Sequence, residues 1–596
     1  MGDKKLKTRD QIDDRYKWKI EKMYPDESKW DEDVKTALSM SEDFLSYQGK
    51  VLASPKTLLD ALVQKDEIFL IAERSYVYAR QRQDEDNRES KYQGMLMKVE
   101  SAIATISANL SFFVPELLSH SKDEIMACFD KETGLETYRF YIEDLLREQE
   151  HVLSGAEENI LAQLGEVLDA PHDIFNMLNN ADIKFGEIID EDGDKVEVTH
   201  GNYISFMQSK NREVRKAAFE AVYKAYSSLG NTISKAYAYN VKTDVIAARL
   251  RKYSSAREAA LSSGNIPEEV YDNLVKVVNN YLPTLHRYIE LRKKVLGLDE
   301  LKMYDVYVPM FDVPEEDIPF EQGVEIVKEA LAPMGSEYVN RLTQGVKDGW
   351  IDIYENEGKT SGAYSFGSYD SMPYVLCNYD NKLQDVFTII HELGHSMHSS
   401  YTRENQPFCY GDHSIFTAEV ASTVNESLLI KYLLGKETDV EKRKYLINYY
   451  LEEFRTTLFR QTMFAEFEQV CHQEVQGGGA LTAEWMNEKY KELNDRYFGP
   501  AIADDEYIQY EWMRIPHFYR SFYVYQYATG YSAATAISKI ILDKGPEDYL
   551  EFLKTGSSNY PVELLKIAGV DMSSPEPIKM AMETFKMLVE ELEKLV

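Results

Sequence analysis

The chain has 596 residues and a formal net charge of −34, from 67 Lys and Arg against 101 Asp and Glu. This acidic balance opposes nucleic-acid binding and leaves no polybasic surface for anionic lipid. Four cysteines without a C-x-x-C pattern predict a reducing compartment. No apolar signal core follows the first residues, and there is no run of about 18 apolar residues. We therefore expect a soluble, cytoplasmic protein without nucleic-acid or membrane partners.

Apolar positions recur at intervals of three and four over most of the chain, which predicts a mainly α fold. At this length two or more lobes are expected, with a cleft between them. The predicted helices cover residues 56–81, 92–113, 213–226 and 441–469, and a terminal helix covers 577–596.

The spacing of apolar residues changes near residue 185. Residues 183–189 and 195–199 alternate as strands and flank an acidic run with Asp192-Gly193 at its tip, which predicts a β-hairpin. We place the lobe boundary there. Residues 1–195 form a helical N-terminal lobe in this interpretation, and residues 196–596 form the catalytic lobe.

Two short β-like runs, 359–366 and 373–378, lie before the next predicted helix. An exposed strand edge here could hold an extended peptide by main-chain hydrogen bonds, which suits a broad substrate range. Gly362 and Ala363 would permit close approach, and Tyr364 follows them. A purely structural hairpin is the alternative.

The run His391-Glu392-Leu393-Gly394-His395 carries the residue types of hydrolytic zinc chemistry. Residues four apart lie on one face of an α-helix, so the two histidines can direct their imidazoles at one ion. Glu392 is offset toward the water that such an ion would activate, and it is the candidate general base. Apolar residues before the run predict a core-anchored helix. The alternative is two hydrogen-bonded core histidines beside a salt-bridged glutamate.

A catalytic zinc ion usually has three protein ligands and one water, so one more donor is needed. Glu404 lies too near His395 along the chain to return over the helix without a very tight loop. Glu419 lies in a segment that predicts a second helix, which can pack antiparallel to the first. We therefore predict that His391, His395 and Glu419 bind one Zn²⁺. Glu426, on the same face as Glu419, either orients a zinc-bound histidine or is an ordinary salt-bridged residue.

Two other zinc-peptidase patterns do not fit these residues. Metzincins have glycine three positions and histidine six positions after the second histidine, where this chain has His398 and Tyr401. Families that resemble thermolysin or the large aminopeptidases place the ligand glutamate at a shorter spacing, where this chain has Ser414 and Ile415.

The run from Val386 to His398, followed by Glu419 in a helical setting, resembles the thimet-oligopeptidase family of zinc metallopeptidases, and within it the bacterial oligoendopeptidase F branch. Three further stretches are similar to that branch: 372–379, 515–530 and 556–561. The resemblance covers residues 200–590 well and the first 190 more loosely. It implies a two-lobed helical zinc peptidase with a deep substrate cleft and a small β-sheet at the cleft edge. His398, in the motif itself, is grouped with the candidate substrate-binding residues.

Peptide hydrolysis also needs hydrogen-bond donors for the oxyanion that forms when water attacks the carbonyl. By resemblance, the family uses a histidine followed by tyrosines near the end of the chain, so His517 and Tyr527 are assigned this role, with Tyr523 as a further candidate. The spacing from this histidine to the tyrosines varies across the wider family, so the choice of tyrosine stays open. For Tyr519 and Tyr525 we prefer aromatic packing.

These residues predict a zinc-dependent endopeptidase that hydrolyses internal bonds of short peptides. In this mechanism Glu392 takes a proton from the attacking water and later delivers it to the leaving amine. The acidic charge favours cationic or neutral peptides over acidic ones. Two alternatives remain: a metallo-carboxypeptidase with a similar helical cleft, and a catalytically silent peptide-binding protein, against which the intact Glu392 argues.

Overall fold

The computed structural model describes residues 6–312 and 316–596, and this part of the chain is mainly helical with two small sheets, as predicted. Mutual contacts group the chain into two compact units, each assembled from three stretches. Unit 1 comprises Met1–Glu150, Glu316–Tyr432 and Ile537–Gly569; unit 2 comprises His151–Glu315, Leu433–Ala536 and Val570–Val596. The predicted boundary near residue 195 falls inside unit 2. A single boundary along the sequence cannot describe units that each combine three stretches, and local patterns do not reveal which distant stretches pack together.

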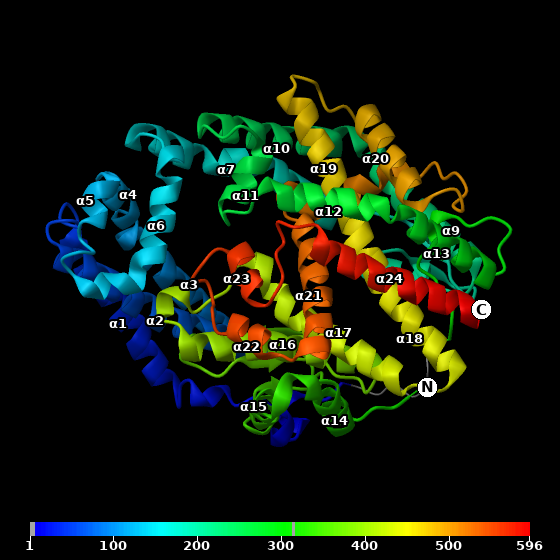
Figure 1. Cartoon of the computed structure of the whole chain (residues 1–596), viewed down its shortest axis with the longest axis horizontal. Coiled ribbons are helices and arrows are strands. Elements are labelled where there is room, and N and C mark those ends of the chain that lie inside the picture. Colours follow the sequence, from blue (N-terminus) through cyan, green and yellow to red (C-terminus); the bar gives the residue numbers. More distant parts are fainter. Residues whose placement is uncertain (1–5, 313–315) are drawn as a thin grey trace. The chain divides into compact units, whose positions relative to one another are not determined.

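Unit 1 begins with long helices that share an apolar core (Figure 1, blue). Helix α2, Pro55–Glu85, packs on α1, Glu27–Phe44, and on α3, Ser90–Leu110. Ser54 caps α2, since its hydroxyl accepts a hydrogen bond from the Thr57 amide at 3.0 Å. Short helices follow: α4 Phe113–Leu118, α5 Lys122–Met126 and α6 Arg139–Arg147.

One stretch in the described part of the chain, Ser90–Leu118, is long and apolar enough to span a membrane by length and composition, a test that core helices of soluble proteins also pass. Its side chains Met95, Val99 and Ile106 are buried in the apolar clusters that it forms with α1 and α2.

A three-stranded sheet in unit 1 has the order β3-β5-β4, so β4 is an edge strand. Strand β3, Ile351–Asp352, runs parallel to β5, Tyr374–Leu376, and β4, Tyr364–Phe366, runs antiparallel to β5. The two predicted β-like runs therefore pair with each other. Trp18, from the start of the chain, packs against this sheet.

Two helices follow the sheet, as predicted. Helix α16, Leu383–Asn405, has one side buried and contacts both β4 and β5, and α17, Ile415–Lys436, comes next. The remaining helices of this unit are α14 Phe320–Ala330, α15 Gly335–Lys347, α22 Glu547–Leu553 and α23 Pro561–Ile567.

Unit 2 contains the predicted hairpin, in which β1, Glu187–Ile189, pairs antiparallel with β2, Lys195–Glu197. The helix predicted over 441–469 is interrupted: a π-helix, Phe454–Phe459, separates α18, Val440–Glu453, from α19, Arg460–Gln476. The other helices are α7 Gly155–Met177, α8 Tyr203–Met207, α9 Arg212–Ser228, α10 Gly230–Leu250, α11 Ala256–Ser262, α12 Glu268–Asn280, α13 Leu282–Val295, α20 Ala483–Phe498, the first half of α21 Tyr525–Lys544, and the predicted terminal helix α24 Glu576–Leu595.

Candidate active site

The three predicted metal ligands come together in unit 1. A carboxylate oxygen of Glu419 on α17 lies 3.5 Å from Nε2 of His391 and 3.6 Å from Nε2 of His395, both on α16. Metal–ligand bonds of about 2.1 Å in a tetrahedral site place donor atoms about 3.4 Å apart. The three side chains therefore fit one shared ion, and all their donor atoms lie within 4.8 Å of one another.

Glu426 contacts the first histidine. Its carboxylate lies 3.1 Å from Nδ1 of His391, which leaves Nε2 of that ring for a metal ion. Burial opposes a charge on His391, but the hydrogen bond to Glu426 and the nearby carboxylates raise the pKa of this imidazole to about 9 in the protein without metal. The hydrogen-bonded His395 holds the pKa of Glu419 at about 2. Both roles considered for Glu426 are compatible with this contact, since it is also an ion pair when His391 is protonated.

Glu392 lies next to the cluster and is 7% exposed. Burial raises the pKa of its carboxyl group, while His391 and His395 oppose that shift. A partly desolvated carboxylate beside a metal site has the properties of a general base. Glu404, the rejected ligand candidate, is an exposed residue and forms an ion pair with Arg341 at 2.8 Å.

The comparisons with known proteins agree with this geometry. Residues 205–584 match Peptidase family M3, and residues 116–185 match a family described as Oligopeptidase F. This chain belongs to peptidase family M3. The family recognised from the sequence is thus confirmed.

Individual known proteins are similar over almost the whole chain. Oligopeptidase PepF of Bacillus subtilis is 47% identical, over 97% of this chain and 87% of that protein. The crystal structure of oligoendopeptidase-F from Enterococcus faecium has 40% identity and a TM-score of 0.74, covering 96% of this chain and 98% of that one. A solved chain from Chlamydophila abortus has 34% identity and a TM-score of 0.93, covering 99% and 100%.

The predicted substrate strand is the edge strand β4. Gly362 has φ +82°, and its carbonyl accepts a hydrogen bond from Nδ2 of the Asn378 side chain at 2.8 Å, which fixes the turn into Ala363 and the strand. Tyr364 donates its hydroxyl to Asp84 at 2.8 Å. Its side chain therefore anchors the strand to α2, and the Phe366 carbonyl of β4 also accepts a hydrogen bond from the Gln81 side chain of α2, at 2.8 Å.

His398 differs from its predicted role as a substrate-binding residue. It is 1% exposed and its ring stacks on that of His413, with centroids 3.8 Å apart. Burial keeps the pKa of His398 well below that of an ordinary histidine. In this structure it packs beneath the site and does not reach a surface that a peptide could touch, because its position on α16 turns it toward the protein interior.

The predicted oxyanion donors form a cluster in unit 2. The Tyr527 hydroxyl lies 3.5 Å from Nε2 of His517, and the ring centroid of Tyr523 lies 5.4 Å from that of Tyr527. Burial lowers the pKa of His517, so the ring is neutral at pH 7 and can donate from one nitrogen. Tyr519 stacks on Phe175 at 4.5 Å, which agrees with a packing role.

Residues that the sequence did not single out hold this cluster. Phe522 has φ +56°, an unusual conformation for a bulky residue, and its amide donates to the buried Glu468 at 2.7 Å. The neighbouring Ser521 hydroxyl donates to Asp244. No local pattern marks Glu468 or Asp244, since each lies on a helix far away in the sequence.

Proposed function

We propose that this chain is a zinc-dependent endopeptidase that hydrolyses internal bonds of short peptides. The observation that carries the proposal is the convergence of His391, His395 and Glu419 on one ion position, with Glu392 beside it. Membership of peptidase family M3 and the oligoendopeptidase names of the relatives support the same activity.

A Zn²⁺ ion held by these three residues supplies a Lewis acid that lowers the pKa of an adjacent water and polarises the scissile carbonyl. Glu392 accepts the proton of the attacking water and then donates it to the leaving amine. Burial raises the pKa of this carboxyl group in the protein without metal. Glu426 holds the His391 ring in the orientation that ligation requires.

We assign His517 and Tyr527, with Tyr523 as the further candidate, to the oxyanion. A neutral imidazole and a phenol each donate one hydrogen bond to the oxygen that becomes negative in the transition state. The mutual contacts of these rings support the assignment, since each ring restricts the orientation of the others.

The edge strand β4, with Gly362 and Ala363 at its start, is the proposed peptide-binding edge. Main-chain hydrogen bonds to such an edge are independent of side-chain identity, which suits a peptidase of broad range. The oligopeptidase names of the relatives support peptides as partners, and the net charge of −34 opposes nucleic acid and anionic membranes. All four cysteines are free thiols, which supports a cytoplasmic location.

Peptides blocked at both termini test the proposal. The zinc-loaded protein is incubated with a mixed library of acetylated and amidated peptides, with and without a chelator, and the products are mapped by mass spectrometry. We expect internal cleavage that the chelator abolishes and added zinc restores. A carboxypeptidase or a silent binding protein would leave every blocked peptide intact, and this result would overturn the proposal. The same peptides with a free C-terminus would then distinguish the two, because only a carboxypeptidase would cut them.

A further inference from the structure

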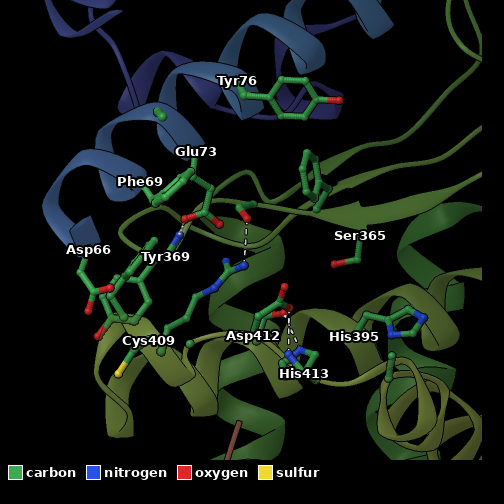
Figure 2. Close-up of a pocket in the computed structure, with 18 of the residues that line it drawn as sticks. Asp66, Phe69, Glu73, Tyr76, Ser365, Tyr369, His395, Cys409, Asp412 and His413 are labelled. Carbon is green, nitrogen blue, oxygen red and sulfur yellow. Dashed lines mark hydrogen bonds between the residues drawn. The ribbon is translucent and has the colours of Figure 1, made fainter. Parts of the chain in front are cut away.

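A cavity of about 640 Å³ lies within unit 1 beside the metal-binding helix (Figure 2). Phe69, Glu73 and Tyr76 on α2 line one side of it. Ser365 and Phe366 of β4 and the candidate metal ligand His395 also line it. A peptide that pairs with β4 and reaches the metal would therefore pass the mouth of this cavity, which is large enough for any amino-acid side chain.

Much of the cavity wall is apolar. Its lining includes Phe69, Ile103, Tyr141, Phe408 and the thiol of Cys409. Such a wall favours the hydrocarbon part of a long side chain, and it also raises the energetic cost of leaving a charged group inside without a partner.

Glu73 is such a group. One carboxylate oxygen accepts a hydrogen bond from the Tyr369 amide at 3.3 Å, and no ion pair to Glu73 is found among the residues that the structure describes. Burial raises the pKa of Glu73 to about 7, although the charge of Arg403 opposes the shift. Figure 2 shows the side chain extending from α2 toward Tyr369 and the cavity. A cation that entered the cavity would supply the missing partner.

The charges around the cavity favour a cation over an anion. Its lining contains the carboxylates of Asp66, Glu73 and Asp412 against the cations of Lys65 and Arg403. The excess is one negative charge when all five groups are ionised.

Arg403 is the group that an anionic ligand would need. Its Nη2 donates to the Gly367 carbonyl at 2.8 Å, and its Nε and Nη1 are shielded from solvent and have no hydrogen-bond partner among the described residues. A carboxylate in the cavity could therefore not reach the two unused donors unless the surrounding residues moved. His413, with burial as the main cause, has its pKa lowered to about 4 and is neutral at pH 7, so it adds no positive charge.

We propose that this cavity is a specificity pocket for a basic side chain of the substrate close to the scissile bond, with Glu73 pairing the cationic end and the apolar wall holding the stem. The inference rests on the proposed endopeptidase function and names the class of residue that the enzyme prefers there. It gives the expected preference for cationic peptides a location.

Paired peptides test the pocket. In a quenched-fluorescent peptide, each position near the cleaved bond is made lysine or norleucine, which have similar hydrocarbon stems and differ in charge. We expect kcat/KM of the wild-type enzyme to favour lysine by about tenfold at one position. Glu73→Gln should bring this ratio close to one, and Glu73→Asp should give an intermediate ratio because it keeps the charge but shortens the reach. Asp60→Asn, an exposed carboxylate elsewhere on α2 that pairs with Lys56, is the matched control and should keep the wild-type ratio.

Each contrary result has a distinct meaning. If kcat/KM were the same for the lysine and norleucine peptides at every position, the pocket proposal would fail but the endopeptidase function would stand. The same holds if Glu73→Gln kept the wild-type ratio of kcat/KM between lysine and norleucine peptides. A preference for glutamate that Arg403→Gln removes would identify an anion pocket instead. If the metal-loaded wild type cleaved no peptide, the proposed function would fail and this inference with it. Circular dichroism and thermal unfolding check the fold of each variant. If Glu73→Gln does not fold, the ratio of kcat/KM for lysine and norleucine peptides in Glu73→Asp tests the pocket instead.

Discussion

Gly394 on α16 lies against the backbone of Ser422 on α17: a Cβ atom at Gly394 would be 2.6 Å from Cα of Ser422. Only glycine allows this approach, because the obstructing atoms are main-chain atoms and not the end of a flexible side chain. The contact sets how closely the helix with both histidines approaches the helix with Glu419. The glycine of the motif thus fixes a distance between ligands.

Gly394→Ala should therefore weaken metal binding. The added methyl group has to push the helices apart, and such overpacking costs about 1–3 kcal/mol in stability. We expect lower zinc content by elemental analysis after dialysis against a weak chelator, and a lower thermal midpoint. Gly435→Ala near the end of α17 is the control, since a Cβ atom at Gly435 would meet no other atom within 4 Å and alanine favours a helix. Wild-type zinc content in Gly394→Ala would show that the helices tolerate the separation.

Glu392→Gln should abolish turnover and retain zinc. The amide keeps the shape of the side chain but cannot take a proton, and loss of a general base costs about 10²–10⁴-fold in rate. Single-turnover cleavage of one blocked peptide, with the zinc content measured on the same sample, separates loss of the general base from loss of the metal. Full activity in the zinc-loaded variant would remove Glu392 from the mechanism.

The metal cluster could be predicted from the sequence because it depends on local periodicity. Residues four apart on α16 share a face, and the pattern of α17 gave Glu419 a helix of its own. The same periodicity did not show that His398 turns inward to stack on His413, since it gives the relative directions of side chains and not what lies outside the helix.

Features that depend on distant stretches could not be predicted. The unit that contains the metal cluster combines residues from the start, middle and end of the chain, and Trp18 of the first stretch supports the sheet before α16. The unusual backbone of Phe522, held by Glu468, also has no sequence signal, because bulky residues rarely adopt φ above zero. Local patterns identify the reacting groups, while the supporting contacts require the fold.

Glu426→Gln should lower zinc affinity without preventing folding. The amide is a weaker hydrogen-bond acceptor for Nδ1 of His391, and loss of such a partner typically costs about 10–100-fold in metal affinity. Competition with a chromogenic chelator measures the change. Glu404→Gln is the matched control, because Glu404 is an exposed carboxylate on the metal-binding helix itself that pairs with Arg341. Equal affinities for the two variants would contradict the role of Glu426.

Tyr527→Phe should lower kcat/KM by about 10²-fold at unchanged zinc content, because it removes one donor to the oxyanion. Tyr519→Phe serves as the comparison. The Tyr519 hydroxyl is buried and has no hydrogen-bond partner in the part of the chain that the structure describes, so its removal should leave kcat/KM unchanged and the thermal midpoint equal or higher. If both variants kept wild-type activity, the oxyanion donors would have to be sought among other residues.

Glu452 should make unit 2 sensitive to acid. Burial opposes ionisation of this carboxyl group, but Arg292 and Arg455, each with a nitrogen 2.7 Å from it, hold its pKa at about 2. A folded-state pKa below the unfolded value near 4.5 stabilises the fold above pH 4.5, and the stabilisation is lost as the pH falls toward 2. The shift corresponds to about 3 kcal/mol.

The pH dependence of thermal unfolding checks this linkage. Glu452→Gln leaves two buried guanidinium groups without their carboxylate, so its thermal midpoint should lie well below that of the wild type at pH 7. The difference should shrink between pH 4.5 and 2, because the wild type then loses the same ion pairs by protonation. Glu441→Gln removes an exposed carboxylate from α18 and should follow the wild-type curve. If the difference in thermal midpoint between wild type and Glu452→Gln stayed constant down to pH 2, ionised Glu452 would not stabilise the fold.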